Sequence, residues 1–194
     1  MNRDQTNQTD EVLMASVADG SSNALETLVY RYKQRLFNYL VRLSGSRSDA
    51  DDLFQETFLR VYKHRQRYDR LARFRPWLYQ IATNVSKDHQ KYMRLRRHPS
   101  LDARTEDGTA WGDRIADPAP GPAEHAAVSD VRDALDRAVG NLPEHQRSVF
   151  LMARYEGLKY DEIAESLDIP VGTVKSRMNK AVNTVMEQVE AVRR

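Results

Sequence analysis

Apolar residues recur every three to four positions over most of this chain, which is the spacing of amphipathic α-helices. The clearest pattern covers about 24–43, where the apolar positions are Leu25, Leu28, Val29, Tyr32, Leu36, Tyr39, Leu40 and Leu43. Shorter patterns predict helices at 11–18, 48–62 and 76–97, and turn residues separate them. The first half therefore predicts a helical domain at 10–97, preceded by a polar, disordered tail at 1–9.

The second half begins with a change of composition. Residues 98–128 have little periodicity and are punctuated by prolines and glycines, which is typical of an extended linker. Helical spacing returns at 129–139 and 143–155 and continues through a helical hairpin at 160–189. The predicted fold class is all-α. It consists of two small helical domains, 10–97 and 129–194, joined by a flexible acidic linker at 98–128.

The hairpin at 160–189 has the pattern of a helix-turn-helix. Ile163, Ala164 and Leu167 share one face of its first helix, and Pro170 fits the start of the second. The second helix has an apolar stripe of Val174, Met178, Ala181, Val182, Val185 and Val189. Its opposite face presents Lys175, Ser176, Asn179 and Lys180, a chemistry suited to base edges and phosphates in a major groove. The alternative is an ordinary amphipathic hairpin with a solvated basic face.

Charge is unevenly distributed along the chain, although the formal net charge is only +2. Residues 60–97 contain 12 Lys and Arg but 2 acidic residues, whereas 98–128 contain 2 Arg and 6 acidic residues. Basic stretches attract phosphate through counterion release. Aromatic residues among the basic ones suit single-stranded nucleic acid, on which bases stack. We assign Trp77 to the core instead, because it is in phase with Ile81.

Acidic residues gather in the helix expected at 48–62. The spacing of Asp49, Asp52 and Glu56 would allow a metal site, but no histidine accompanies them, and carboxylates at a helix start are stabilised by the helix dipole. The chain has no cysteine, which excludes disulfides and thiolate ligands. We expect no metal, no cofactor, no catalytic residue, no membrane span and no export signal, and we expect a cytoplasmic protein.

Five separated motifs occur in an order that resembles one family. They are 49–58 (DADDLFQETF), 77–84 (WLYQIATN), 142–144 (LPE), 162–164 (EIA) and 172–177 (GTVKSR). Over about residues 10–190 the chain resembles bacterial RNA polymerase sigma factors of the extracytoplasmic-function (ECF) type, in the sigma-70 family. The resemblance implies a dissociable specificity subunit, not an enzyme, that binds core polymerase and directs initiation at promoters with −35 and melted −10 elements.

The resemblance also implies residue roles. The helix at 48–62 matches the segment that docks on core polymerase, through Asp49, Asp52, Gln55 and Glu56. Residues 68–74 and the following helix match the segment that captures the melted −10 strand, which involves Arg75, Tyr79, Asn84, Lys87 and Lys91. The second helix of the hairpin matches the −35 reader, which involves Thr173, Lys175, Ser176, Arg177, Asn179 and Lys180. The partners implied are core RNA polymerase, promoter DNA and an anti-sigma factor.

Two departures and two alternatives accompany this interpretation. Asp168 stands where many such turns have glycine, so we expect a less tight turn, and Asn179 and Lys180 replace residues often bulky or arginine. One alternative is a helix-turn-helix transcription regulator with an N-terminal helical sensor domain, which predicts tight duplex binding without polymerase. The other is a nucleic-acid enzyme that uses the acids at 49–56, which predicts a divalent metal requirement.

Overall fold

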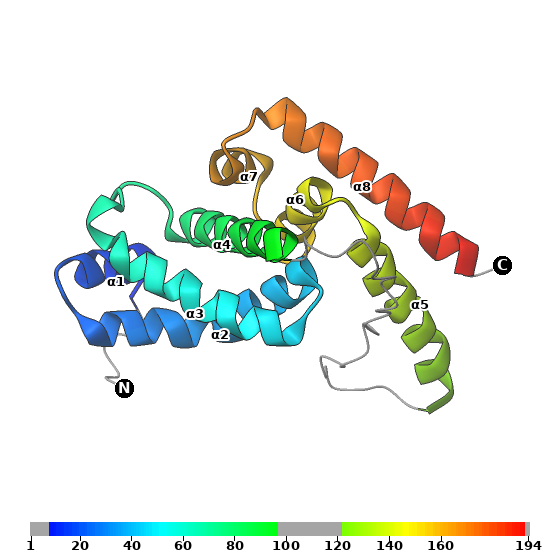
Figure 1. The fold of residues 1–194 in the computed structure, drawn as a ribbon, viewed down its shortest axis with the longest axis horizontal. Helices are drawn as coiled ribbons and strands as arrows, with labels where there is room; N and C mark the ends of the chain where they lie inside the picture. Colours follow the sequence, from blue (N-terminus) through cyan, green and yellow to red (C-terminus); the bar gives the residue numbers. More distant parts are fainter. Residues whose placement is uncertain (1–7, 97–121, 193–194) are drawn as a thin grey trace.

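The computed structural model describes residues 8–96 and 122–192 (Figure 1). The first part contains α1 (Asp10–Ala18), α2 (Ser22–Ser44), α3 (Arg47–Lys63), the 3-10 helix η2 (Arg65–Arg67) and α4 (Phe74–Arg96). The second part contains α5 (Pro122–Asn141), α6 (Glu144–Arg154), α7 (Tyr160–Leu167) and α8 (Val171–Val192). These residues form no strand, and the predicted all-α class is confirmed.

The N-terminal helices pack as a bundle in which α2 lies against α1, α3 and α4 (Figure 1). Side-chain caps fix where the helices begin, since the Ser21 hydroxyl accepts from Ala24 N and the Ser46 hydroxyl accepts from Asp49 N. Gly45, at φ +78°, ends α2 in the left-handed conformation that glycine adopts most easily. The α2 periodicity is confirmed by the full burial of Leu28 and Leu36, each of which contributes about 1.5–3 kcal/mol.

The C-terminal helices α5, α6 and α7 all contact the long helix α8 (Figure 1). Leu142, Val149, Leu151, Met152, Ile163 and Val174 are buried between them. The two groups of helices also touch each other, through α4 with α7 and through α2 with α5 and α6. The structure is therefore closed, with α7 packed against α4 and with α5 and α6 packed against α2.

Two predicted boundaries differ from the structure. The helix expected to begin at 129 begins at Pro122, so 122–128 are helical and only the rest of the predicted linker lies outside the described residues. Proline is favoured at the first helical position, and the alanines that follow have the highest helix propensity. At the other end, Thr9 belongs to the fold rather than to a disordered tail, because its hydroxyl caps α1 by accepting from Val12 N.

Over the described ranges, 8–96 and 122–192, none of the helices has both the length and the apolar character that crossing a membrane requires.

Candidate nucleic-acid and polymerase interfaces

The turn between α7 and α8 is tight although it contains no glycine. Asp168 adopts φ 51° and ψ 52°, the left-handed conformation, and is the only non-glycine residue with positive φ in the described parts of the chain. Its N–H and that of Ile169 close the end of α7 by donating to the carbonyls of Glu165 and Ala164, at 3.3 and 3.0 Å. The expectation of a less tight turn is therefore wrong, because aspartate tolerates this conformation better than most residues.

Helix α8 presents one face to the core and another to solvent. Val174, Met178 and Ala181 are buried, which confirms the predicted stripe. Lys175, Ser176, Asn179 and Lys180 are all exposed on the other side, and Thr173 and Arg177 are half-buried at its margins. Ser176 donates its hydroxyl to the Thr173 carbonyl at 3.1 Å. The structure thus brings together the six residues predicted to read the −35 element, on the helix whose place in the hairpin suits entry into a major groove.

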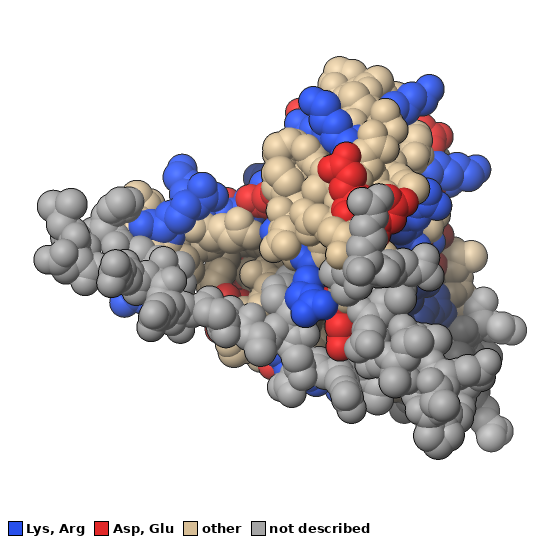
Figure 2. Space-filling model, turned by 90° about the vertical axis from the view of Figure 1, so that its right-hand side faces the viewer, with Lys and Arg blue, Asp and Glu red and all other residues tan. Residues whose placement is uncertain are grey.

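On the face drawn in Figure 2, positive charge is not gathered into one continuous patch. In Figure 2, Lys and Arg side chains project separately from the upper part of the molecule, where α7 and α8 lie, and acidic side chains stand between them. A surface of this kind favours contacts from individual side chains over strong non-specific attraction to DNA.

The residues predicted to contact the −10 strand divide into two sets on α4. Asn84, Lys87 and Lys91 are exposed and lie at i, i+3 and i+7, so they form one outward face. Arg75 and Tyr79 lie elsewhere. Arg75 is half-buried, and Tyr79 is fully buried, with its ring edge-on to Tyr39 at 5.0 Å between centroids. The assignment of Tyr79 to the outer side of α4 is a correction, because this helix is covered on two sides.

Glu156 of the C-terminal group is the partner of Tyr79. The Tyr79 hydroxyl donates to the Glu156 carboxylate, which is only 5% exposed and lies 3.5 Å from the Arg35 Nε atom. Burial raises the pKa of Glu156, although the Tyr79 hydrogen bond and the charge of Arg35 oppose that rise. Burial, together with the negative charge of Glu156, raises the pKa of Tyr79 above its usual range. The ionised form of Glu156 is therefore less stable at this buried position than it would be in water.

Further polar contacts join α4 and the preceding loop to α7. The Arg73 guanidinium pairs with Glu162, and the Ser166 hydroxyl donates to the Pro76 carbonyl at 3.0 Å. Sequence patterns gave no sign of the interhelical contacts of Glu156, Glu162 or Ser166, because polar residues used across an interface do not alter hydrophobic periodicity. In this arrangement the start of α4 faces protein rather than solvent.

The face predicted to bind polymerase lies on α3. Asp52 and Gln55 are exposed, and Asp49 is half-buried in the first turn. Glu56 is engaged within the bundle, because its carboxylate accepts from Arg60 Nε at 2.7 Å and Arg60 also pairs with Asp88 of α4 at 2.7 Å. These two carboxylates raise the pKa of Arg60. Leu59, which is 63% exposed, adds apolar surface to the same helix.

An all-helical chain with an exposed polar and basic face on the second helix of a helix-turn-helix defines a class of DNA-binding proteins. Comparison with known families identifies the protein family within this class. Residues 28–97 match the family model described as Sigma-70 region 2, and residues 132–185 match Sigma-70, region 4. The ECF RNA polymerase sigma-E factor of Haemophilus influenzae is 32% identical over 184 residues, which is 94% of this chain and 96% of the relative. The chain therefore belongs to the ECF RNA polymerase sigma factors of the sigma-70 family.

Solved structures show the same fold at lower identity. CnrH, in complex with the cytosolic domain of CnrY, gives a TM-score of 0.67 at 22% identity over 95% of this chain and 99% of that chain. The sigma factor RpoE of Bartonella quintana, in complex with the anti-sigma factor NepR, gives 0.62 at 22% identity over 85% and 96%.

Family membership decides the broad function. A sigma factor directs promoter-specific initiation and is not an enzyme, since the chemistry belongs to the polymerase. The alternatives of a regulator with a sensor domain and of a nucleic-acid enzyme are set aside, because the N-terminal residues match region 2 of the sigma family.

Proposed function

We propose that this ECF sigma factor divides promoter recognition between α8 and α4. Lys175, Ser176, Asn179 and Lys180 read the −35 duplex, with Thr173 and Arg177 at the backbone, while Asn84, Lys87 and Lys91 contact the melted −10 strand. The observation that carries the proposal is the two-sided character of α8, whose apolar side is buried and whose polar and basic side is exposed.

The second element of the proposal is the opening of the closed structure on the promoter. Arg75, which is half-buried, also contacts −10 DNA and reaches it after α7 leaves α4. The support for this step is that Glu156 engages Tyr79 and Ser166 engages Pro76 in the closed structure. Two weak sites on one chain then act together, because binding of the first raises the effective concentration of the second.

The third element concerns partners and place of action. Asp49, Asp52, Gln55 and Glu56 of α3 form the docking face for core RNA polymerase, with the exposed Leu59 beside them. An anti-sigma factor holds the protein inactive, which is supported by a similar fold that was solved in complex with one. The protein acts in the cytoplasm, where polymerase meets the chromosome.

The first prediction tests the DNA and polymerase faces separately. We expect the wild-type protein to bind purified core polymerase and to start transcription at a defined subset of a promoter library. Asp52→Ala with Gln55→Ala should weaken core binding. Lys175→Ala with Lys180→Ala should keep core binding and reduce initiation by about tenfold or more, because each lost base or phosphate contact costs about 1–3 kcal/mol.

Lys33→Ala is the matched control, because it removes one exposed lysine from α2. Tight duplex binding without polymerase, together with no initiation at any promoter, would contradict the proposal.

A further inference from the structure

The loop that precedes α4 has a definite shape of its own. Residues 68–73, called the 68–73 loop, join η2 to α4. Tyr68 is buried, with its ring 5.0 Å from that of Trp77, and its hydroxyl donates to the Ala72 carbonyl at 2.5 Å. The Asp69 carboxylate accepts from Leu71 N at 2.9 Å. Leu71, at the tip, is 95% exposed. The loop is thus ordered internally and presents an apolar side chain to solvent beside the start of α4.

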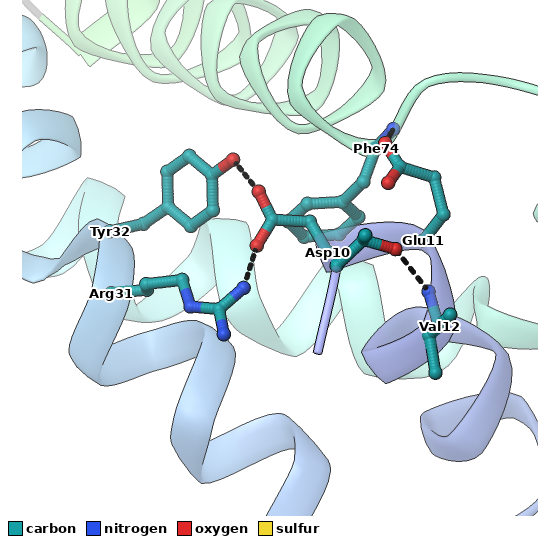
Figure 3. A network of polar contacts seen from close by, with 7 residues as sticks. Asp10, Glu11, Val12, Arg31, Tyr32 and Phe74 are labelled. Carbon is teal, nitrogen blue, oxygen red and sulfur yellow. Dashed lines mark hydrogen bonds and ion pairs between the residues drawn. The ribbon is translucent and has the colours of Figure 1, made fainter. Parts of the chain in front are cut away.

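Helix α1 and Asp19, the residue that follows it, contact this loop and its surroundings at three points. The Glu11 carboxylate accepts from Phe74 N at 3.2 Å, which caps the first residue of α4 from a helix 63 positions away in the chain (Figure 3). The amide of Gln66 in η2 donates to the Ala18 carbonyl at 2.6 Å, and Arg70 pairs with Asp19 at 2.8 Å. A carboxylate at a helix N-terminus satisfies an unpaired N–H and interacts favourably with the helix dipole.

Helix α1 is itself firmly placed. Leu13, Met14 and Val17 are fully buried, and the Asp10 carboxylate accepts from both Arg31 and Tyr32 of α2 (Figure 3). The ring of Tyr32 lies edge-on to that of Phe74, at 5.6 Å between centroids. Burial raises the pKa of Tyr68 to about 12, and the negative charge of Glu11 contributes to that rise. The Glu11 carboxylate therefore lies where the 68–73 loop meets the start of α4.

We propose that α1 preorganises the 68–73 loop for the melted −10 strand and that Glu11 is a positioning residue for this step. The inference rests on the proposed function, in which the segment around α4 receives that strand. A loop already held in its binding shape loses little conformational entropy when DNA arrives, whereas a loose loop must be ordered at that moment. The contacts from α1 belong to the same group of helices as α4, so they persist when α7 moves away.

The test uses full-length protein assembled with core polymerase. The ligands are a single-stranded oligonucleotide with the non-template −10 sequence of a responsive promoter and, separately, its −35 duplex. Glu11→Ala should weaken binding of the −10 strand by about tenfold, the usual scale for loss of a helix cap. Affinity for the −35 duplex and for core polymerase should be unchanged. Glu11→Gln should restore most of the loss, because its amide oxygen still accepts from Phe74 N.

Two further variants complete the design. Glu26→Ala removes an exposed glutamate of α2 and should leave both DNA affinities unchanged. Asp19→Ala removes the exposed tether to Arg70 without disturbing the core, so it tests the loop even if Glu11→Ala folds poorly. It should weaken −10 binding alone, by a smaller factor.

The binding measurements distinguish failure of this inference from failure of the proposed function. Unchanged −10 affinity in both Glu11→Ala and Asp19→Ala would overturn the inference, as would equal losses at the −10 strand, the −35 duplex and core polymerase. If wild-type holoenzyme showed no preference for the −10 strand, the proposed function would fail first and this inference would fail with it.

Discussion

At the scale of single residues, the turn of the helix-turn-helix depends on one side chain in an unusual conformation. Asp168 has positive φ and is exposed, so its side chain contributes little packing to offset the strain. A left-handed conformation costs an L-residue about 1–2 kcal/mol, and aspartate and asparagine tolerate it best. The stability of this turn should therefore vary with the residue at 168 in a defined order.

We expect Asp168→Ala to lower the free energy of unfolding by about 1 kcal/mol, because alanine lacks the local hydrogen bonding that helps aspartate in this conformation. Asp168→Asn should be neutral. Urea unfolding followed by circular dichroism measures the differences. Glu165→Ala, at an exposed position of α7, is the control. Equal midpoints for wild type and Asp168→Ala would contradict the prediction, because aspartate would then have no advantage over alanine in this conformation.

At the scale of helices, Arg147 of α6 joins the ends of two others. Its guanidinium donates to the Leu43 carbonyl near the end of α2 at 3.0 Å, and to the Gly140 and Leu142 carbonyls near the end of α5 at 2.5 and 2.8 Å. Carbonyls at helix C-termini lack partners within their helix and carry partial negative charge, so a cation is favourable there. Burial lowers the pKa of Arg147, and the charge of Glu144 opposes that effect.

We expect Arg147→Ala to reduce the free energy of unfolding by about 2–3 kcal/mol, since it leaves three partly buried carbonyls without this donor. Arg147→Lys should recover less than half of the loss, because an ammonium lacks the planar fork that reaches three acceptors. Thermal unfolding provides the comparison. Arg154→Ala, in the last turn of α6, serves as a control. Full recovery by lysine would show that charge alone matters.

The sequence predicted helices better than it predicted which of their faces are covered. The helices, the turn and the α8 stripe could be predicted from periodicity, because each of these helices buries a single apolar face. Helix α4 is different, since it is covered by α2 and α3 and also by α7. Its buried surface also includes Thr83, which is hydrogen-bonded to Tyr39 of α2, and Ser86; both are polar and give no hydrophobic signal. Their burial depends on partners distant in the chain, which periodicity does not contain.

At the scale of the whole molecule, the contact of the two helix groups includes a titratable group. Glu156 has a raised pKa in the closed structure because burial disfavours its ionised form. A carboxyl group that binds its proton more tightly when folded favours the folded state increasingly as the pH falls through its raised pKa. The buried Glu156 carboxylate lowers the free energy of unfolding by its full amount at pH values above the raised pKa. This destabilisation disappears at pH values below the pKa of an exposed carboxyl group.

We expect Glu156→Gln to be at least as stable as wild type at pH 7, because glutamine still accepts from Tyr79 without a buried charge. The difference should shrink as the pH approaches that of an exposed carboxyl group. Unfolding free energies of both proteins over about pH 3.5–8, a range that extends below the ordinary carboxyl pKa, give the comparison. Glu26→Gln is the control for loss of an exposed charge. A difference independent of pH would contradict the prediction.

The exposed and buried faces of α4 should differ in how readily they accept substitutions during evolution. In the proposed function Asn84, Lys87 and Lys91 contact the −10 strand. Because they are exposed, we expect substitutions there to change DNA preference without affecting the rest of the fold. Tyr79 is buried, and any replacement removes its contact with Glu156. Divergence of promoter preference among descendants of this chain should therefore begin on the exposed face, while position 79 changes only together with position 156.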